Sequence, residues 1–323
     1  MSKLFAAVDL GGTSIRAAIA NEQAEVLESR SIRTESHEGP AAVVHRIGKL
    51  VQDLLHQVGS ETSLAGLGMG VPGLVDANTG TTKFLPNLPT QWRDVPVAAQ
   101  LQEQLQCPVR LLNDVRTATL GELRFGHGQQ NPNMTLAFFS LGTGVGGGVA
   151  IDGKIRLGPL GAAGELGHQT ILANGPRCGC GNRGCLETLA SGPAIAAEGI
   201  RLMRMGLAPN LHQLVDGDEQ RVSTREMNEV ADRDDAIREA IVIAAKHLGI
   251  AAANVVTILH PDMVVLGGGV AEIGDLLVNT VRDVVRERVC MFPTDNVQIE
   301  KSLLGEMAGL IGAVALAIDA VRL

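Results

Sequence analysis

Two segments of the chain repeat one pattern. Residues 6–20 (AAVDLGGTSIRAAIA) and residues 137–153 (AFFSLGTGVGGGVAIDG) each run from an apolar stretch through a glycine turn into a second apolar stretch. This pattern is typical of a β-hairpin, and its repetition indicates that one hairpin-bearing unit has been duplicated. We therefore expect two lobes with related folds.

The remaining apolar pattern predicts an α/β protein. Val, Leu and Ile are concentrated in short stretches bounded by Gly or Pro, which predict strands at residues 4–10, 15–20, 67–71, 109–112, 136–141, 145–151 and 263–266. Apolar residues at helical spacing predict helices at residues 40–58, 97–105, 236–248, 273–289 and 308–321. Alternation of strands and helices is the signature of an α/β sheet. The 323 residues, 45% apolar, suffice for one large or two medium domains.

Composition and charge exclude several classes of partner. Aromatic residues make up 2% of the chain, which disfavours a stacking platform for single-stranded nucleic acid. The 27 Lys and Arg against 35 Asp and Glu give a net charge of -8, without a basic run for nucleic acid or anionic lipid. We expect a small-molecule partner and no nucleic acid.

The N-terminal sequence and the cysteine count predict a cytoplasmic protein. Asp9 interrupts the first apolar stretch too early for a signal peptide, and no uncharged apolar stretch of ~18 residues is evident, so no membrane span is expected. The five cysteines are an odd number, and Cys107 and Cys290 are isolated. This distribution does not fit a secreted disulfide framework and indicates a reducing compartment.

Both glycine turns carry a threonine and suit anion binding. Glycine lets backbone N–H groups approach an anion closely, and a Thr hydroxyl adds a donor. Two such turns could hold a polyphosphate, but ordinary tight hairpins have the same composition. The P-loop pattern is absent, as is the Rossmann glycine pattern after the first strand. A third glycine run, residues 264–274, either lines a nucleotide or only joins a strand to a helix.

Asp114 follows a Val- and Leu-rich strand and precedes a helical pattern in the segment VRLLNDVRTATLGEL (residues 109–123). A carboxylate at the C-terminal end of a sheet strand lies where open α/β folds bind ligands. There it could accept a hydroxyl proton during phosphoryl transfer. Asp is also among the commonest helix N-caps, so a capping role is the alternative.

Three of the five cysteines are clustered in CGCGNRGCLE, residues 178–187. Together with His168, the side chains of Cys178, Cys180 and Cys185 form a Cys3His set suited to a closed, structural zinc site. A Cys-x-Cys redox pair and free buried thiols are the alternatives. Glu165 and Glu187 bracket the set and are either solvated acids or acceptors for sugar hydroxyls.

The cysteine segment resembles the signature C-x-C-G-x-x-G-C-x-E of the ROK family of sugar kinases and repressors. Further motifs follow in that family's order along almost the whole chain: DLGGT (9–13), GVPGLVD (70–76), PNLPTQW (86–92), LNDVRTATLGE (112–122), LGTGVGGG (141–148), GELGH (164–168), VVLGGGV (264–270) and AGLIGAVALA (308–317). Within the family, the chain is most similar to the bacterial ATP-dependent glucokinases.

The resemblance implies an actin-like, hexokinase-like ATPase fold and a hexose 6-kinase acting on glucose. Asp114 would be the general base. The sugar would contact Gly73, Asn87, Asn113, Asp114, Glu165, His168 and Glu187. His168 would use its second ring nitrogen to bind zinc. Asp9 would help to organise Mg²⁺, and the turns Gly11–Thr13 and Gly142–Gly144 would receive the ATP phosphates. The full set of residues expected to bind the cofactor is Asp9, Gly11, Gly12, Thr13, Gly142, Thr143, Gly144, Gly267 and Gly268.

The resemblance also implies domain boundaries and an oligomer. We expect a small lobe of residues 1–112 joined by the C-terminal helix 306–323. The large lobe would comprise residues 113–305 and carry the zinc loop 164–187. A homodimer or homotetramer is expected. Other hexoses that would fit the same residues are N-acetylglucosamine, N-acetylmannosamine, mannose and fructose, and polyphosphate or ADP could replace ATP as donor.

Three features separate this chain from its relatives. The repressors of the family carry a winged helix-turn-helix before the first hairpin. Because Asp9 of that hairpin is only the ninth residue here, no such domain is expected before it. Many relatives have Glu-Asn-Asp-Ala-Asn where this chain has Leu-Asn-Asp-Val-Arg at residues 112–116. We expect Arg116 to lie on the surface rather than in the cleft. Met307 replaces the usual acidic residue before Ala-Gly-Leu, a change expected to affect packing.

Overall fold

The computed structural model describes residues 3–59 and 63–322 and divides into two compact units. The first unit comprises residues up to 133, 149–164 and those from 307 onward; the second comprises residues 134–148 and 165–306. This division differs from the expected boundary at residue 112. Residues 113–133 belong to the first unit because α3 (Asp114–Phe125) packs along α10 (Ala308–Arg322).

The first unit is built on a mixed sheet of five strands in the order β3-β2-β1-β4-β7. β1 is antiparallel to β2, and β4 lies parallel to both β1 and β7. The strands are β1 (Phe5–Leu10), β2 (Ser14–Ala20), β3 (Val26–Arg33), β4 (Gly66–Val71) and β7 (Val109–Asn113). A separate hairpin pairs β5 (Leu74–Asp76) with β6 (Thr81–Phe84). Every residue of the interior strand β4 is buried.

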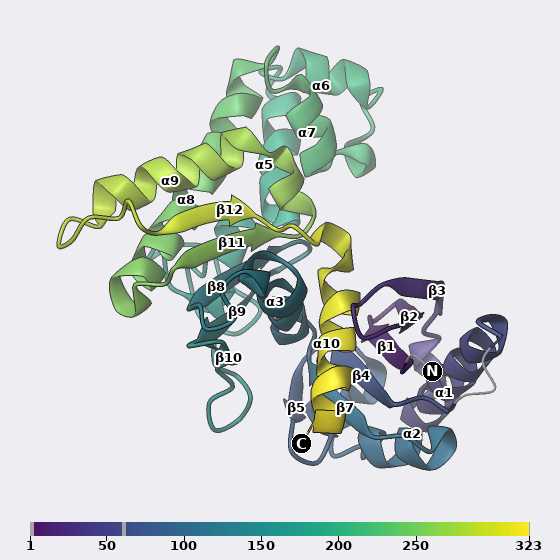
Figure 1. Ribbon diagram of the computed structural model, residues 1–323. Helices are drawn as coiled ribbons and strands as arrows, with labels where there is room; N and C mark the ends of the chain where they lie inside the picture. The colour runs from purple at the N-terminus through teal and green to yellow at the C-terminus, as the bar shows by residue number, and fades with distance from the viewer. Residues whose placement is uncertain (1–2, 60–62, 323) are drawn as a thin grey trace. The chain divides into compact units, whose positions relative to one another are not determined.

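Helices pack against this sheet. α1 (Pro40–Gln57) contacts β2 and α2 (Val97–Leu105), and Pro40 occupies its first turn. α10, the last helix of the chain, lies along β1 and β4 from the beginning of the chain (Figure 1). Gly68 makes this approach possible, because a Cβ there would lie 2.0 Å from the carbonyl oxygen of Ala313.

The crossing of α3 and α10 also depends on glycine and leads to a testable prediction. A Cβ at Gly312 would lie 1.8 Å from the carbonyl oxygen of Thr117, a rigid backbone atom. We expect Gly312→Ala to lower the free energy of unfolding by roughly 1–3 kcal/mol, because the helices must separate. Gly309→Ala is the matched control, because its methyl would lie 3.5 Å from Asp9. Urea unfolding of both variants measures the difference, and equal midpoints would contradict the close crossing.

The second sheet repeats the order of the first. Its five strands run β10-β9-β8-β11-β12, so a three-strand meander is followed by two strands added on the other side, as in β3-β2-β1-β4-β7. β11 is parallel to both β8 and β12. The strands are β8 (Leu136–Leu141), β9 (Val145–Ile151), β10 (Lys154–Ile155), β11 (Met263–Gly267) and β12 (Gln298–Lys301). The shared order confirms the duplication predicted from the two hairpins.

The second unit is rich in helices: α4 (Glu187–Ala190), α5 (Gly192–Arg204), α6 (Pro209–Leu214), α7 (Thr224–Val230), α8 (Asp235–Leu259) and α9 (Asp275–Arg288). α8 is apolar and long enough to cross a membrane, with a hydropathy of 1.8 over its most apolar window. More than half of that window, 56%, is buried inside the protein, and α8 packs against α9, α5 and α7. It is therefore a core helix, although the sequence reading did not foresee an apolar stretch of this length.

The sequence reading missed elements that lack an apolar pattern. β3 and β12 are edge strands with mostly exposed or half-exposed residues, so they carry no buried face to signal a strand. α8 extends eleven residues beyond residue 248, to Leu259, because its second half is apolar on several faces. It ends where His260 adopts a left-handed conformation (φ 43°) before Pro261.

Candidate active site

The predicted base lies where a strand passes directly into a helix. β7 ends at Asn113 and α3 begins at Asp114. Asn113 is the helix cap, because its side chain accepts hydrogen bonds from the backbone N–H groups of Val115 and Arg116. The alternative that Asp114 is the cap is therefore wrong. Asp114 is half-buried, and its Oδ1 accepts from Val115 N at 2.9 Å.

Asn113 is linked to two other parts of the first unit. Its Nδ2 donates to the carbonyl oxygen of Gly73 at 3.2 Å, which brings together two predicted sugar contacts. Its Oδ1 accepts from Nη1 of Arg116 at 2.9 Å. The prediction that Arg116 lies on the surface is wrong, because this residue is 2% exposed. Its guanidinium also donates to the carbonyl of Ala163, so hydrogen bonds offset the cost of burial.

The first glycine turn lies between β1 and β2. The Thr34 hydroxyl donates to the carbonyl of Gly11 and thereby holds this turn. A Cβ at Gly12 would lie 3.1 Å from the carbonyl oxygen of Asn87, so Gly12 and the predicted sugar contact Asn87 are neighbours. Thr13 ends the turn, and its carbonyl accepts from Thr34 N.

Asp9 stands at the end of β1, paired across the hairpin with Arg16. Burial raises the pKa of its carboxyl, and the positive charge of Arg16 partly opposes this shift. A nearby cation stabilises the ionised form of a buried carboxyl group. Asp9 therefore fits a role as a ligand of a Mg²⁺ ion that also binds phosphates. Gly309 of α10 also approaches Asp9, a neighbour that the sequence reading did not include.

In the second unit, the four predicted zinc ligands converge. The ligand atoms of His168, Cys178, Cys180 and Cys185 all lie within 4.8 Å of one another. His168 Nδ1 is 3.7 Å from Cys178 Sγ, and the Sγ atoms of Cys180 and Cys185 are also 3.7 Å apart. Zn–S bonds of ~2.3 Å at tetrahedral angles require sulfur atoms about 3.8 Å apart. The four side chains therefore fit one tetrahedral zinc ion.

A tight loop presents these cysteines. Arg177 and Arg183 form an antiparallel β-bridge, and the backbone N–H of Cys178 donates to the carbonyl of Asn182. A Cβ at Gly184, where φ is 64°, would lie 1.6 Å from the carbonyl oxygen of Leu172, so only glycine fits. Burial raises the pKa of Cys178, and burial with hydrogen bonds among the thiols raises that of Cys185 to about 12. Zinc would have to displace their protons.

Glu187 connects the cysteine loop to the second glycine turn. Its Oε1 accepts from Cys178 Sγ at 3.5 Å, and its Oε2 accepts from Val145 N at 3.2 Å. A Cβ at Gly144 would lie 2.4 Å from Oε2 of Glu187, so a larger residue there would displace this carboxylate. A Cβ at Gly167 would lie 1.7 Å from the carbonyl oxygen of Val145. The loop that carries His168 therefore packs directly on this turn.

The second glycine turn, residues 142–144, and the third glycine run, residues 264–274, lie beside each other in the second unit. Gly192, the first residue of α5, donates its N–H to the carbonyl of Gly142. A Cβ at Gly268, where φ is 84°, would lie 2.4 Å from the carbonyl oxygen of Leu141. Thus residues 142–144, Gly267, Gly268 and the N-terminus of α5 come together. Helix N-termini and glycine turns both present N–H groups to anions.

A cavity of about 430 Å³ adjoins the third glycine run. It is lined by Ser223, Thr224, Arg225, Asn228, Gly269, Glu272 and Ile273. Its walls come from the start of α7 and from the 3-10 helix that follows Gly268. Gly269, Glu272 and Ile273 belong to the third glycine run that the sequence analysis named. The four residues at the start of α7 were not predicted, because single Ser, Thr and Asn residues on helices carry no recognisable signal.

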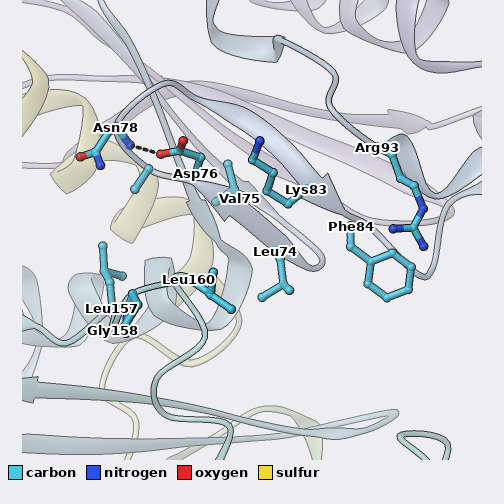
Figure 2. Close-up of a pocket in the computed structure, with 13 residues that line it drawn as sticks. Leu74, Val75, Asp76, Asn78, Lys83, Phe84, Arg93, Leu157, Gly158 and Leu160 are labelled. Carbon is cyan, nitrogen blue, oxygen red and sulfur yellow. Dashed lines mark hydrogen bonds between the residues drawn. The ribbon is translucent and has the colours of Figure 1, made fainter.

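Figure 2 shows a cavity of about 570 Å³ in the first unit, between the β5–β6 hairpin and residues 157–161. Leu74, Phe84 and Leu160 supply apolar walls. The guanidinium of Arg93 lies over the Phe84 ring at 4.9 Å. None of the predicted site residues lines this cavity, although Gly73 precedes Leu74 and packs on Phe84, two residues of its walls.

The structure brings together subsets of the predicted residues within each unit. The first unit groups Gly73 with Asn113 and Asp114, and Gly12 with Asn87. The second groups His168, the three cysteines and Glu187 with residues 142–145, whereas Glu165 is exposed. Arg116 is the main residue whose contacts sequence reasoning misjudged. The departure of Arg116 from the pattern implied by the resemblance was the only sequence feature that pointed to an unusual role for this residue.

Known proteins resemble this chain over most of its length. The ROK family model matches residues 5–320. A glucokinase of Halalkalibacterium halodurans is 34% identical over 95% of this chain and 93% of its own length. A xylose repressor of Caldicellulosiruptor bescii is 30% identical over 97% of this chain and 77% of its own length.

A solved structure is also similar: a ROK family glucokinase from Streptomyces griseus in complex with glucose and AMPPNP. It is 30% identical, has a TM-score of 0.82, and is matched over 98% of this chain and 99% of that chain. Motif order, the duplicated sheet topology and the four assembled zinc ligands agree with the match of the family model over residues 5–320. The chain therefore belongs to the ROK family and has its actin-like, hexokinase-like ATPase fold.

Proposed function

We propose that this chain is an ATP-dependent hexose kinase that phosphorylates the 6-hydroxyl of glucose. The placement of Asp114 carries the proposal: a half-buried carboxylate at the end of β7, beside Asn113 and Gly73. Asp114 accepts the hydroxyl proton while the sugar oxygen forms a bond to the γ-phosphorus. The bond from that phosphorus to the bridging oxygen breaks, and ADP leaves with the electron pair. Catalysis then depends mostly on positioning and charge neutralisation.

The proposed sugar contacts come from side chains with complementary hydrogen-bonding roles. Asn87 and Asn113 supply amide groups, and Glu165 and Glu187 supply acceptors. Gly73 lets the backbone approach, because at φ 148° a Cβ would lie 2.3 Å from the carbonyl oxygen of Phe84. His168 turns Nδ1 toward Cys178, which leaves Nε2 for a sugar hydroxyl. N-acetylglucosamine, N-acetylmannosamine, mannose and fructose are the alternative sugars for the same residues.

The glycine turns are proposed to receive ATP. Residues 11–13 and 142–144 offer backbone N–H groups to the phosphates, and Gly267 and Gly268 border the nucleotide. The cavity lined by Gly269 has room for the adenosine part, at about 430 Å³. The resemblance to a structure that contains AMPPNP supports ATP as the donor. When bound, Mg²⁺ held by Asp9 would neutralise phosphate charge.

Zinc is proposed as a structural ion. The set His168, Cys178, Cys180 and Cys185 fills all four positions of a tetrahedral shell, so no position is left for a reactive water. When bound, zinc would supply rigidity to the loop and fix the tautomer of His168. The imidazole would then present Nε2 in one orientation.

We also propose a cytoplasmic location and a homodimer or homotetramer. All five cysteines are free, which fits a reducing compartment. Size-exclusion chromatography with light scattering would give the oligomeric state directly.

A sugar-responsive repressor core is the second candidate function. The observation that favours it is the 30% identity to a xylose repressor over 97% of this chain. The glucokinase of Halalkalibacterium halodurans is matched over 93% of its length, against 77% of that repressor. A repressor core would bind sugar without turnover, so an activity assay separates the two functions.

The assay is a coupled measurement of ADP release from Mg-ATP with glucose, mannose, fructose, N-acetylglucosamine and N-acetylmannosamine. We expect turnover with glucose far above the other four. A preference for an acetamido sugar would keep the kinase assignment and replace the substrate. No ADP release with any of the five, together with sugar binding by calorimetry, would favour the repressor core.

A further inference from the structure

We infer that Arg116 is a positioning residue that links Asn113 to the carbonyl of Ala163 and so organises the sugar-binding part of the first unit. The inference rests on the proposed function, because Asn113 is a proposed sugar contact of the first unit. Glu165, two residues after Ala163 and the start of a segment of the second unit, is another proposed sugar contact. We call the hydrogen bonds of Arg116 to Asn113 and Ala163 the Arg116 link.

Burial identifies Arg116 as an unusual arginine. It is 2% exposed and is among the largest fully buried side chains of the protein. Arginine is rarely buried unless it is paired, because removing its charge from water is costly. An apolar or smaller polar side chain would fill the first turn of α3 without that cost. The hydrogen bonds that Arg116 makes are therefore a reason for its presence.

At Ala163, two guanidinium nitrogens donate to one carbonyl oxygen. Nε lies 3.2 Å and Nη2 lies 2.9 Å from this oxygen. Residues 157–164 form neither helix nor strand, and three of their glycines have positive φ: 69° at Gly158, 70° at Gly161 and 89° at Gly164. Such a segment has many accessible backbone conformations when it is released. The Arg116 link restrains it directly before the chain continues into Glu165.

At Asn113, the link determines which polar atom remains for a ligand. Oδ1 accepts from Val115 N at 3.0 Å, from Arg116 N at 3.2 Å and from Arg116 Nη1 at 2.9 Å. Nδ2 has two N–H groups and uses one for the carbonyl of Gly73. The amide oxygen is thus fully used, and Asn113 offers a sugar oxygen one N–H donor.

The guanidinium geometry is needed for this link. Its planar fork reaches Asn113 with Nη1 and Ala163 with Nε and Nη2 at the same time. A lysine ammonium is a single point of donation on a flexible stem and cannot bridge the two acceptors in the same way. An asparagine side chain is too short to reach both acceptors.

The test compares Arg116→Ala and Arg116→Lys with the matched control Arg110→Ala. Arg110 is half-buried on β7, and in residues 3–59 and 63–322 its side chain has no hydrogen bond or ion pair. We expect both Arg116 variants to raise the KM for sugar roughly tenfold to a hundredfold, with the KM for ATP unchanged. Millimolar guanidinium should partly restore the KM of Arg116→Ala, whereas uncharged urea should not. Arg110→Ala should match the wild type.

Hydrogen exchange provides a readout that does not need activity. We expect the amides of residues 157–165 to exchange faster in Arg116→Ala than in the wild type or Arg110→Ala, and guanidinium to slow them again. Unchanged exchange in these amides would overturn the inference, as would a KM for sugar equal to that of the wild type. If the wild type turns over no sugar, the proposed function fails, while the exchange result still decides the Arg116 link.

Discussion

Asp114→Asn is expected to lose nearly all turnover, about 10²–10⁴-fold in kcat, while the KM for glucose stays close to that of the wild type. The amide keeps the shape of the side chain at the start of α3, and Asn113 continues to cap the helix. Only the ability to accept the hydroxyl proton is removed. Steady-state kinetics with ADP release measures the effect.

Asp53→Asn is the matched control. It makes the same chemical change at an exposed position on α1, elsewhere in the first unit. Its kinetics should be those of the wild type. Zinc content should be unchanged in both variants. An Asp114→Asn protein that retains a tenth or more of its turnover would contradict the assignment of Asp114 as the base.

Cys180→Ser is expected to release zinc and to weaken sugar binding. Serine is a poor zinc ligand, and with three ligands left the loop loses the ion that holds it. Without zinc, His168 no longer has a fixed tautomer or orientation, so the KM for sugar should rise, roughly tenfold. Elemental analysis of the purified protein measures zinc, and kinetics measures the KM.

Cys290→Ser provides the comparison for this variant, because Cys290 is exposed, lies outside the cluster, and donates to the carbonyl of Glu287. It should keep both its zinc and its KM. If Cys180→Ser retained the zinc content of the wild type, the four-ligand site would be refuted. Loss of zinc with an unchanged KM would instead separate the metal from sugar binding.

The interior of the fold was predictable from the sequence because burial leaves a pattern. β1, β4, β8 and β11 are buried along their length or nearly so, and their apolar stretches stand out between glycines. β3 and β12 were missed because an edge strand needs no apolar face. The boundary between the units was misplaced because α3 belongs with α10, a contact between residues almost 200 positions apart.

The clustering of the four candidate zinc ligands was predictable for a different reason. Metal chemistry restricts the residue types so strongly that Cys178, Cys180, Cys185 and His168 could be identified without a fold. The contacts of Arg116 could not, because an arginine on a helix faces solvent in most proteins. Its burial is decided by the segment containing Ala163, which lies 47 residues away in the chain.

The sequence by itself determined the duplicated α/β architecture, the family, the candidate base and the candidate zinc ligand set, since each depends on local pattern or on residue chemistry. Only the tertiary structure decided which residue caps α3, where Arg116 lies, how Glu187 joins the cysteine loop to the turn at Gly144, and that α3 belongs to the first unit. These features depend on packing between segments distant in the chain. Their distances and hydrogen bonds follow from the shape of the folded protein, which no single stretch of sequence specifies.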